Sequence, residues 1–169
     1  MLESGGIRSV TMLGVAKKVG IKGASLYKHF SDAEQLLIAL EELNLGDLGQ
    51  ALSDAEQSVP GLAREFLRFC KSRPEQSKLL FRSGNPEVSA MTMRAPLALL
   101  THLLGDPQEA LIRLRILTSF LHGFNLMDEA GAFRQGGDLS PVVEAGLRLI
   151  VPEFGWMESK RTSENHLSC

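Results

Sequence analysis

Glycine and proline divide this sequence into stretches that each repeat apolar residues with a helical period. Gly20 closes the first such stretch, and Pro74, Pro107 and Pro141 stand beside the ends of later ones. No stretch alternates apolar and polar residues over the roughly four to eight positions expected of a strand. The pattern therefore predicts an all-α fold, with short helices crowded into the first 30 residues and longer ones after them.

About eight helices are expected, and side chains that favour helix ends mark several of them. Thr11 is a suitable cap for the first helix, Ser31 or Asp32 for the third, Asp106 for the longest and Ser140 for the last. The expected ranges are 11–19, 23–30, 32–52, 61–73, 75–81, 89–104, 106–130 and 139–151.

Two of these helices carry residues that disfavour a helix interior. Gly46 and Gly49 are expected to weaken the far end of the third helix. Pro96 falls inside the range 89–104, where it either kinks the helix or marks its true start.

The composition is typical of a soluble globular protein. Apolar residues make up 44% of the 169 residues and charged residues 22%, close to the usual values. No apolar run reaches the ~18 residues that a membrane span needs, and no secretory signal opens the chain. Cys70 and Cys169 are isolated, which predicts a reducing, cytoplasmic location rather than a disulfide framework.

The sequence lacks the usual signatures of catalysis and metal binding. The histidines at 29, 102, 122 and 166 do not have the H-x-x-x-H or H-E-x-x-H spacing of a zinc site. There is no nucleophile elbow, phosphate-binding loop or dinucleotide fingerprint. We therefore expect no metal, no cofactor and no enzymatic activity.

The charge is distributed unevenly along the chain. Residues 1–30 carry five basic side chains and one acidic side chain, whereas the other 139 residues carry 13 basic and 19 acidic ones. A basic head on an acidic body is the pattern expected when only the head meets a polyanion.

The stretch VAKKVGIKGASLYKHF, residues 15–30, has the form of two short helices joined by a tight turn at Gly20. Ile21 is expected to point into a small core, together with Val15, Ala16, Val19, Leu26 and Phe30. In a helix-turn-helix the second helix lies in the major groove of DNA. The residues left for DNA contact are Thr11, Lys22, Gly23, Ser25, Tyr27, Lys28 and His29.

These residues suit different parts of the duplex. Lys22, Gly23 and Ser25 lie at the leading end of the second helix, where base edges would be met. The hydroxyl and basic side chains of residues 27–29 suit phosphate oxygens, and the helix beginning at Thr11 could direct free N–H groups at a further phosphate. The alternative is an ordinary helical hairpin whose polar face is basic.

The stretch TMLGVAKKVGIKGASLYKHFSDAEQLLIAL resembles the DNA-binding region of the tetracycline-repressor (TetR) family of bacterial transcription regulators. The resemblance covers residues 5–45, and weaker likenesses to one class of the family's C-terminal domains occur at EFLRFCKSRPEQSKLLF and FLHGFNLMDEAGAF. It implies a helix-turn-helix head on a larger helical bundle, a homodimer and a role in transcription, most often repression. The matching positions are Thr11-Met12, Val15-Ala16, Val19-Gly20-Ile21, Ala24, Leu26 to Phe30, Glu34 and Leu36-Leu37.

The sequence departs from the family pattern in two respects. The family opens with a helix of about four turns that covers the helix-turn-helix, and the residues before position 5 are expected to supply only the end of that helix, through either a start assigned too late or a real loss. A shortened helix is expected to leave Val15, Leu26 and Phe30 with less cover. The family also usually has a lysine at the place of Ala33, so one phosphate contact is expected to be lost.

Two later helices are apolar on more than one face and predict a dimer interface. We expect it to run through residues 108–128 and 140–151, where two helices from each protomer would form a four-helix contact. Gly146 would permit close approach of a neighbouring helix. In a monomer the same helices would instead be central.

The remaining apolar side chains of the body predict a pocket for a small apolar effector. Aromatic and methionine residues at helical spacing are also typical of an ordinary core, and that interpretation stays open. Candidate polar groups are His102, Thr118, His122 and Asn125. The residues assigned to the pocket are Phe66, Phe69, Phe81, Met93, Leu97, Phe120, His122 and Phe124.

Together these observations predict a protein in two parts with a tail. Residues 1–45 form a helix-turn-helix head, residues 46–155 an effector-binding and dimerising body, and residues 156–169 a flexible tail. The predicted function is that of a DNA-binding repressor released from its operator by the effector. The alternative is a dimeric small-molecule-binding or protein-interaction module that has lost tight DNA binding.

Overall fold

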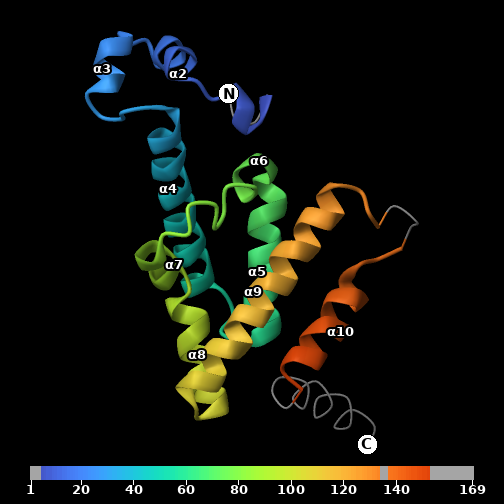
Figure 1. Ribbon diagram of the computed structural model, residues 1–169. Helices are drawn as coiled ribbons and strands as arrows, with labels where there is room; N and C mark the ends of the chain where they lie inside the picture. The colour runs from blue at the N-terminus through green and yellow to red at the C-terminus, as the bar shows by residue number, and fades with distance from the viewer. Residues whose placement is uncertain (1–4, 134–136, 153–169) are drawn as a thin grey trace, which may run out of the picture.

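The computed structural model describes residues 5–133 and 137–152, and within them it confirms the all-α class: there are helices and no strand (Figure 1). A short 3-10 helix, η1 (Ile7–Ser9), precedes the α-helices. The expected tail at 156–169 lies outside the described residues. The α-helices are α2 (Met12–Val19), α3 (Gly23–Tyr27), α4 (Ala33–Asp54), α5 (Val59–Ser72), α6 (Pro74–Ser77), α7 (Pro86–Thr92), α8 (Arg94–Leu104), α9 (Pro107–Glu129) and α10 (Ser140–Ile150).

One end of the molecule, which we call the head, consists of η1, α2, α3 and the first turns of α4 (Figure 1). Its core is a small apolar cluster of Met12, Ala16 and Leu26. Four partly buried apolar residues pack against this cluster: Val15, Phe30, Ala33 and Leu36.

Two of the residues assigned to this core lie outside it. Val19 and Ile21 were expected to point inward, and both are exposed. Val19 is the last residue of α2, directly before the turn, so the chain leaves α2 before α3 can cover it. Met12 takes the inner place instead, because it lies one turn before Ala16 on the same side of α2.

Helix α4 connects the head to the rest of the chain, which we call the body (Figure 1). Its first turns share the head cluster through Leu36, and its later turns enter the body core through Leu45 and Leu48. Gly46 and Gly49 do not end it. A Cβ atom at Gly49 would lie 3.1 Å from Cα of Thr92, so the glycine lets α7 approach α4 closely.

The body is a bundle in which α4, α5, α8, α9 and α10 surround one apolar core. Helix α9 is the longest element, and it runs beside α10 in Figure 1. Its cap is Asp106, as predicted, whose Oδ1 accepts from the N–H groups of Gln108 at 2.8 Å and Glu109 at 3.4 Å. Side chains also cap α2, α4, α5 and α7, whereas α3, α6, α8 and α10 begin without a side-chain cap.

Two sequence expectations about helix ends need correction. The range 89–104 belongs to two helices, α7 and α8, with a break at Met93. Pro96 lies in the first turn of α8, which agrees with the alternative that it marks a helix start. Ser140 is the first residue of α10 rather than its cap. Its N–H and its hydroxyl both donate to Oδ1 of Asp138, at 2.9 and 2.8 Å, and no side chain caps α10.

Gly146 marks the closest packing between α9 and α10. A Cβ atom at this position would lie 2.3 Å from the ring of Phe120, so any larger residue forces the ring or the helix to move. Gly46, on the exposed side of α4, has no atom within 4 Å of such a Cβ.

We therefore predict opposite effects for two glycine-to-alanine changes. Gly146→Ala should lower the free energy of unfolding by about 1–3 kcal/mol, because it overpacks the contact with Phe120. Gly46→Ala should raise it by about 0.5–1 kcal/mol, because alanine is the better helix former and meets no neighbour. Urea unfolding followed by circular dichroism measures both, and a stabilising Gly146→Ala would contradict the packing described here.

Candidate nucleic-acid interface and body cavity

The turn between α2 and α3 has the geometry that the sequence predicts. Gly20 is left-handed, with φ 76° and ψ 26°, a conformation that favours glycine. Its N–H donates to the carbonyl of Lys17, and the N–H of Ile21 donates to the carbonyl of Ala16 at 3.0 Å. This pair of bonds closes α2 and turns the chain into α3 at a new angle (Figure 1).

The predicted cap of α2 is confirmed. Thr11 has extended backbone, and its Oγ1 accepts from the N–H of Gly14 at 3.1 Å. Lys22 is the residue before α3, and its side chain makes no capping bond. The N–H of Ser25 donates to the carbonyl of Lys22 at 2.9 Å, which begins the five-residue helix.

The residues assigned to DNA contact lie on the outer surface of the head. The side chains of Lys22, Lys28 and His29 are exposed, and Tyr27 is 53% exposed. Gly23 and Ser25 are partly buried, and Leu26 between them and Tyr27 is the residue that anchors α3 in the head core.

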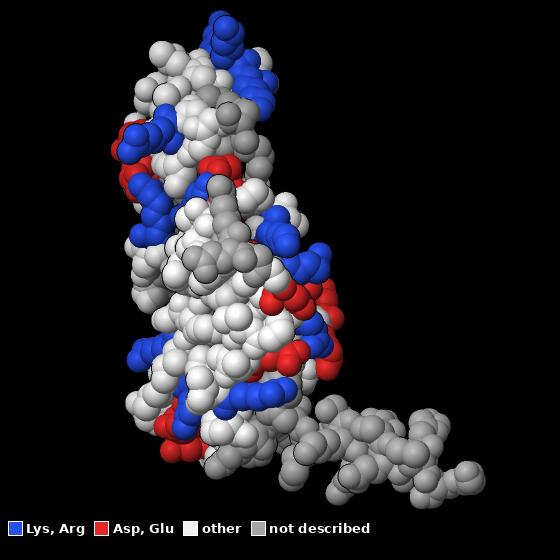
Figure 2. Space-filling model, turned by 90° about the vertical axis from the view of Figure 1, so that its right-hand side faces the viewer, with Lys and Arg blue, Asp and Glu red and all other residues white. Residues whose placement is uncertain are grey.

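Basic side chains gather on this part of the molecule without acidic ones among them. Residues 5–31 hold Arg8, Lys17, Lys18, Lys22 and Lys28 and no aspartate or glutamate. On the face shown in Figure 2, the tip of the head carries basic side chains, and both signs are mixed over the body. The head therefore presents a positive surface to its surroundings.

The body contains an apolar cavity of about 50 Å³ between α4, α5, α8 and α9. Thr118 brings the one side-chain hydroxyl of its described lining, and this hydroxyl lies 3.9 Å from Sδ of Met93. The apolar lining residues are Leu52, Val59, Leu62, Ala63, Phe66, Met93, Pro96, Leu99, Leu100, Leu114, Leu117 and Leu121.

Of the eight residues assigned to the effector pocket, Phe66 and Met93 line this cavity. Phe69 is buried under the guanidinium of Arg73, 4.7 Å from the ring centre. Leu97 packs on the body core from its edge. Phe124 lines a separate open groove between α5, α9 and α10, with Phe120 6.1 Å away between ring centres.

The other two assigned residues face each other outside the cavity. The rings of Phe81 and His122 meet edge to face at 5.7 Å between centres. Nδ1 of His122 is buried and has no hydrogen-bond partner among the described residues. Burial lowers the pKa of His122, and the nearby carboxylate of Glu129 opposes that shift only in part.

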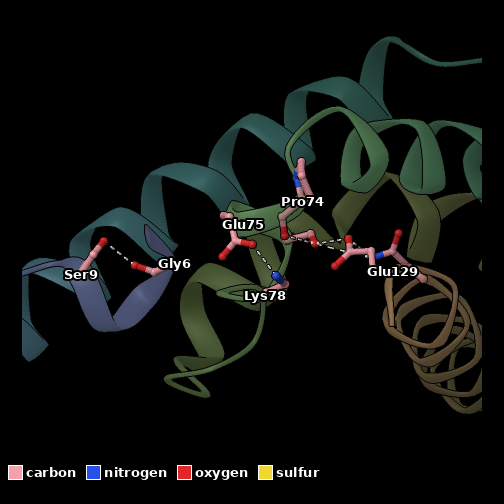
Figure 3. Close-up of polar contacts among 8 residues, drawn as sticks. Gly6, Ser9, Pro74, Glu75, Lys78 and Glu129 are labelled. Carbon is pink, nitrogen blue, oxygen red and sulfur yellow. Dashed lines mark hydrogen bonds and ion pairs between the residues drawn. The ribbon is translucent and has the colours of Figure 1, made fainter. Parts of the chain in front are cut away.

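Helix α6 stands between the head and α9, as Figure 3 shows. On one side, a Cβ atom at Gly6 would lie 3.2 Å from Oε2 of Glu75, so the start of the head packs on α6. On the other side, the buried hydroxyl of Ser77 donates to Oε1 of Glu129 at 3.0 Å. Nδ2 of Asn125 donates to the same oxygen at 3.0 Å.

The segment 73–85 also holds α4 along much of its length. Among these contacts, Glu41 is only 1% exposed, and both of its carboxylate oxygens accept from the N–H of Ser83, at 3.0 and 2.8 Å. Hydrogen bonds from Arg82 lower the pKa of Glu34 at the exposed end of the row. The other contacts are Arg73 to Asp47 at 2.6 Å, Asn44 to the carbonyl of Gln76 at 2.9 Å, Arg82 to Glu34 at 2.7 and 2.8 Å, and Asn85 to Glu42 at 2.9 Å.

Within residues 5–133 and 137–152, no helix is long and apolar enough to cross a membrane. No group of three or more histidine, cysteine or acidic side chains in that part of the chain is placed to hold a metal ion. Cys70 is buried, and burial raises the pKa of its thiol to about 12.

Comparison with known proteins agrees with the resemblance seen in the sequence. Residues 1–40 match the model of the bacterial regulatory proteins of the tetR family. No curated protein matches the chain. The fold is similar to that of SCO4313, described as a candidate regulatory protein, with a TM-score of 0.73 and 23% identity over 89% of each chain. It is also similar to a protein of unknown function from Rhodococcus sp. RHA1, with a TM-score of 0.68 and 22% identity over 90% of this chain and 89% of that one.

The environment of His122 predicts a pH dependence of stability. Because its folded pKa lies below the ordinary value of 6.5, the unfolded chain binds more protons below that pH. Stability should therefore fall as the pH drops through about 6.5 and keep falling until the folded pKa is reached. Urea unfolding between pH 8 and pH 5 measures this loss.

His122→Gln should flatten that part of the pH profile, because glutamine cannot be protonated there. The control is His102→Gln, which removes an exposed histidine on α8. An unchanged profile in His122→Gln would mean that other groups carry the dependence.

Proposed function

We propose that this chain, whose residues 1–40 match the model of the tetR family of bacterial regulatory proteins, is a dimeric repressor that binds operator DNA through α3 and is released by a small apolar effector. The observation that carries the proposal is the exposure of Lys22, Tyr27, Lys28 and His29 at the two ends of α3, a short helix that the left-handed Gly20 turns away from α2. Residues 1–45 would serve as the DNA-binding part and residues 46–155 as the effector-binding and dimerising part.

The proposed DNA contacts fall into two groups. Lys22, Gly23 and Ser25 lie at the leading end of α3 and would meet base edges in the major groove. Tyr27, Lys28 and His29 would contact phosphate oxygens, and the N–H groups at the start of α2, behind Thr11, would contact another. Phosphate contacts hold the helix in place but carry no sequence information, so the two groups predict different mutant behaviour.

The proposed dimer rests on an exposed apolar stripe along α9. Ile112, Ile116 and Met127 are exposed, and their spacing places them on one side of the helix. Gly123 lies on the same side, and no atom of the described chain comes within 4 Å of a Cβ built there. A second copy of α9 could therefore approach closely at this point. Leu149 of α10 is exposed as well.

The proposed effector site is the cavity lined by Phe66, Met93 and Thr118. An apolar lining with a single hydroxyl suits a small uncharged ligand, because a charged ligand would lose its hydration without finding a partner. The cavity of about 50 Å³ is smaller than an engineered protein cavity of roughly 150 Å³ that binds benzene. Binding would therefore have to push α5, α8 and α9 apart.

The displacement of these helices on effector binding could release the head from operator DNA. Helix α5 is followed directly by the segment 73–85, which binds α4 through Glu41 and α9 through Ser77. Moving α5 or α9 would shift the segment, and α4 would carry the shift to the head. Phe81, inside the segment, has φ 64°, a strained value for a residue with a side chain. A coupling of about 1–3 kcal/mol would give a clear response.

The DNA-binding part of the proposal predicts a uniform loss of affinity for Lys28→Ala. Removing one phosphate contact should weaken binding on all duplexes alike and lower the slope of log K against log salt by about 0.9. The matched control is Lys71→Ala, an exposed lysine of α5 in the body, which should leave both unchanged. Fluorescence anisotropy at several salt concentrations, with duplexes selected from a random pool, measures both quantities.

A wild-type chain that retains no duplex from the pool would contradict the proposal and favour a module without DNA binding. A loss confined to some sequences in Lys28→Ala would contradict its phosphate role.

A further inference from the structure

Leu13 is a large apolar side chain that the fold of the head does not use. It is 73% exposed, although its neighbour Met12 is buried in the head core. Val19, at the other end of α2, is also exposed, at 65%. Leu13 is not part of the apolar cluster of the head, and it stands on a surface with four lysines and one arginine.

Leu13 lies against the leading end of α3. A Cβ atom built on Gly23 would be 3.6 Å from Cδ2 of Leu13, which is ordinary van der Waals contact. Exposed Ala24 follows Gly23 directly. The outer edge where α2 meets α3 is therefore apolar, with Leu13 standing beside two residues that have almost no side chain.

The charges around this edge indicate which kind of partner it could bind. Lys22 precedes Gly23, and Lys17, Lys18 and Lys28 lie on the same two helices and the turn after them, with no acidic residue between positions 5 and 31. An apolar spot within a basic surface fits a polyanion that also offers apolar groups. The C5-methyl group of thymine is the apolar group that base pairs present in the major groove of DNA.

The side chains at the leading end of α3 also limit other ways of reading bases. Residues 23–27 include no arginine, lysine, asparagine, glutamine or acidic residue, the types that bond base edges most specifically. The polar side chains near that end are Lys22, directly before α3, and the partly buried Ser25. Hydrogen-bonded recognition at the leading end of α3 would therefore rest on these two side chains.

We propose that Leu13, together with Ala24, reads thymine methyl groups in the major groove, so that α2 as well as α3 determines which sequence is preferred. The inference rests on the proposed DNA binding and adds the chemical group that is recognised. Leu13 would act as a specificity residue through contact with the base itself.

The test replaces thymine by deoxyuridine, which pairs identically and lacks only the methyl group. Duplexes are first selected from a random pool with the full wild-type chain at fixed salt. Each thymine of a selected duplex is then replaced singly, and dissociation constants are measured by fluorescence anisotropy. Loss of one methyl contact at about 0.8 kcal/mol corresponds to a weakening of about fourfold, which we expect at one or two positions in each half-site.

The variant Leu13→Ala should bind the thymine and uracil duplexes equally at the position that Leu13 contacts. Leu13→Met, which keeps an apolar side chain of similar length, should retain most of the fourfold difference. The matched control is Leu43→Ala, because Leu43 is 71% exposed on α4 and is not part of the α2–α3 edge. Circular dichroism checks that each variant keeps its helices.

The possible failures separate the two proposals. If no duplex is retained from the pool, both DNA binding and methyl recognition are overturned. If duplexes bind tightly but no uracil substitution weakens binding, DNA binding stands and the inference falls. If uracil weakens binding to the same extent in wild type and Leu13→Ala, the methyl group is read by another residue and the role of Leu13 is overturned.

Discussion

The contact between the buried carboxylate of Glu41 and the N–H of Ser83 joins the two halves of this molecule. Helix α4 belongs to both halves, since Leu36 packs in the head and Leu48 in the body. A helix alone fixes the distance between its two ends, but it does not fix the rotation or tilt of the head relative to the body. The row of polar contacts to segment 73–85 adds that restraint, and Glu41 and Asn44 are its buried members. An apolar cluster of Leu37 and Leu79, with Ile7 and Val10 of the head packed on it, adds to the same restraint. Exposed ion pairs such as Arg82 with Glu34 contribute little to the free energy of folding by themselves.

The same segment explains how a small cavity could influence a distant surface. The cavity lies against α5 and α9, and segment 73–85 continues from α5 and binds α9 through Ser77. A ligand larger than the present cavity would have to displace these helices before it could enter. The proposed response is therefore mechanical and local: packed helices shift, the segment with its strained Phe81 shifts with them, and α4 follows.

Features that depend on neighbouring residues are predicted correctly from the sequence. Prediction from the sequence fails for features that depend on where distant segments meet. Thr11, Gly20 and Asp106 act within one turn of the chain, and each was identified correctly as a helix end. The cavity lining depends on where α5, α8 and α9 cross. Phe69 has the apolar character of a pocket residue, but it packs in the body core and does not line the cavity. Glu41 sits in the stretch LEELNL and looks like an ordinary solvated carboxylate until Ser83 covers it.

The most direct test is to measure whether Glu41 fixes the orientation of the head relative to the body. Spin labels at Lys18→Cys in the head and His102→Cys in the body, in a Cys169→Ser background diluted with unlabelled chain, report the distance by electron paramagnetic resonance. Glu41→Gln keeps an oxygen acceptor for Ser83, whereas Glu41→Leu leaves that N–H without a partner. We expect one narrow distance distribution for the wild type and Glu41→Gln, and a clearly broader one for Glu41→Leu. An equally narrow distribution in Glu41→Leu, or a broad one in the wild type, would contradict the account.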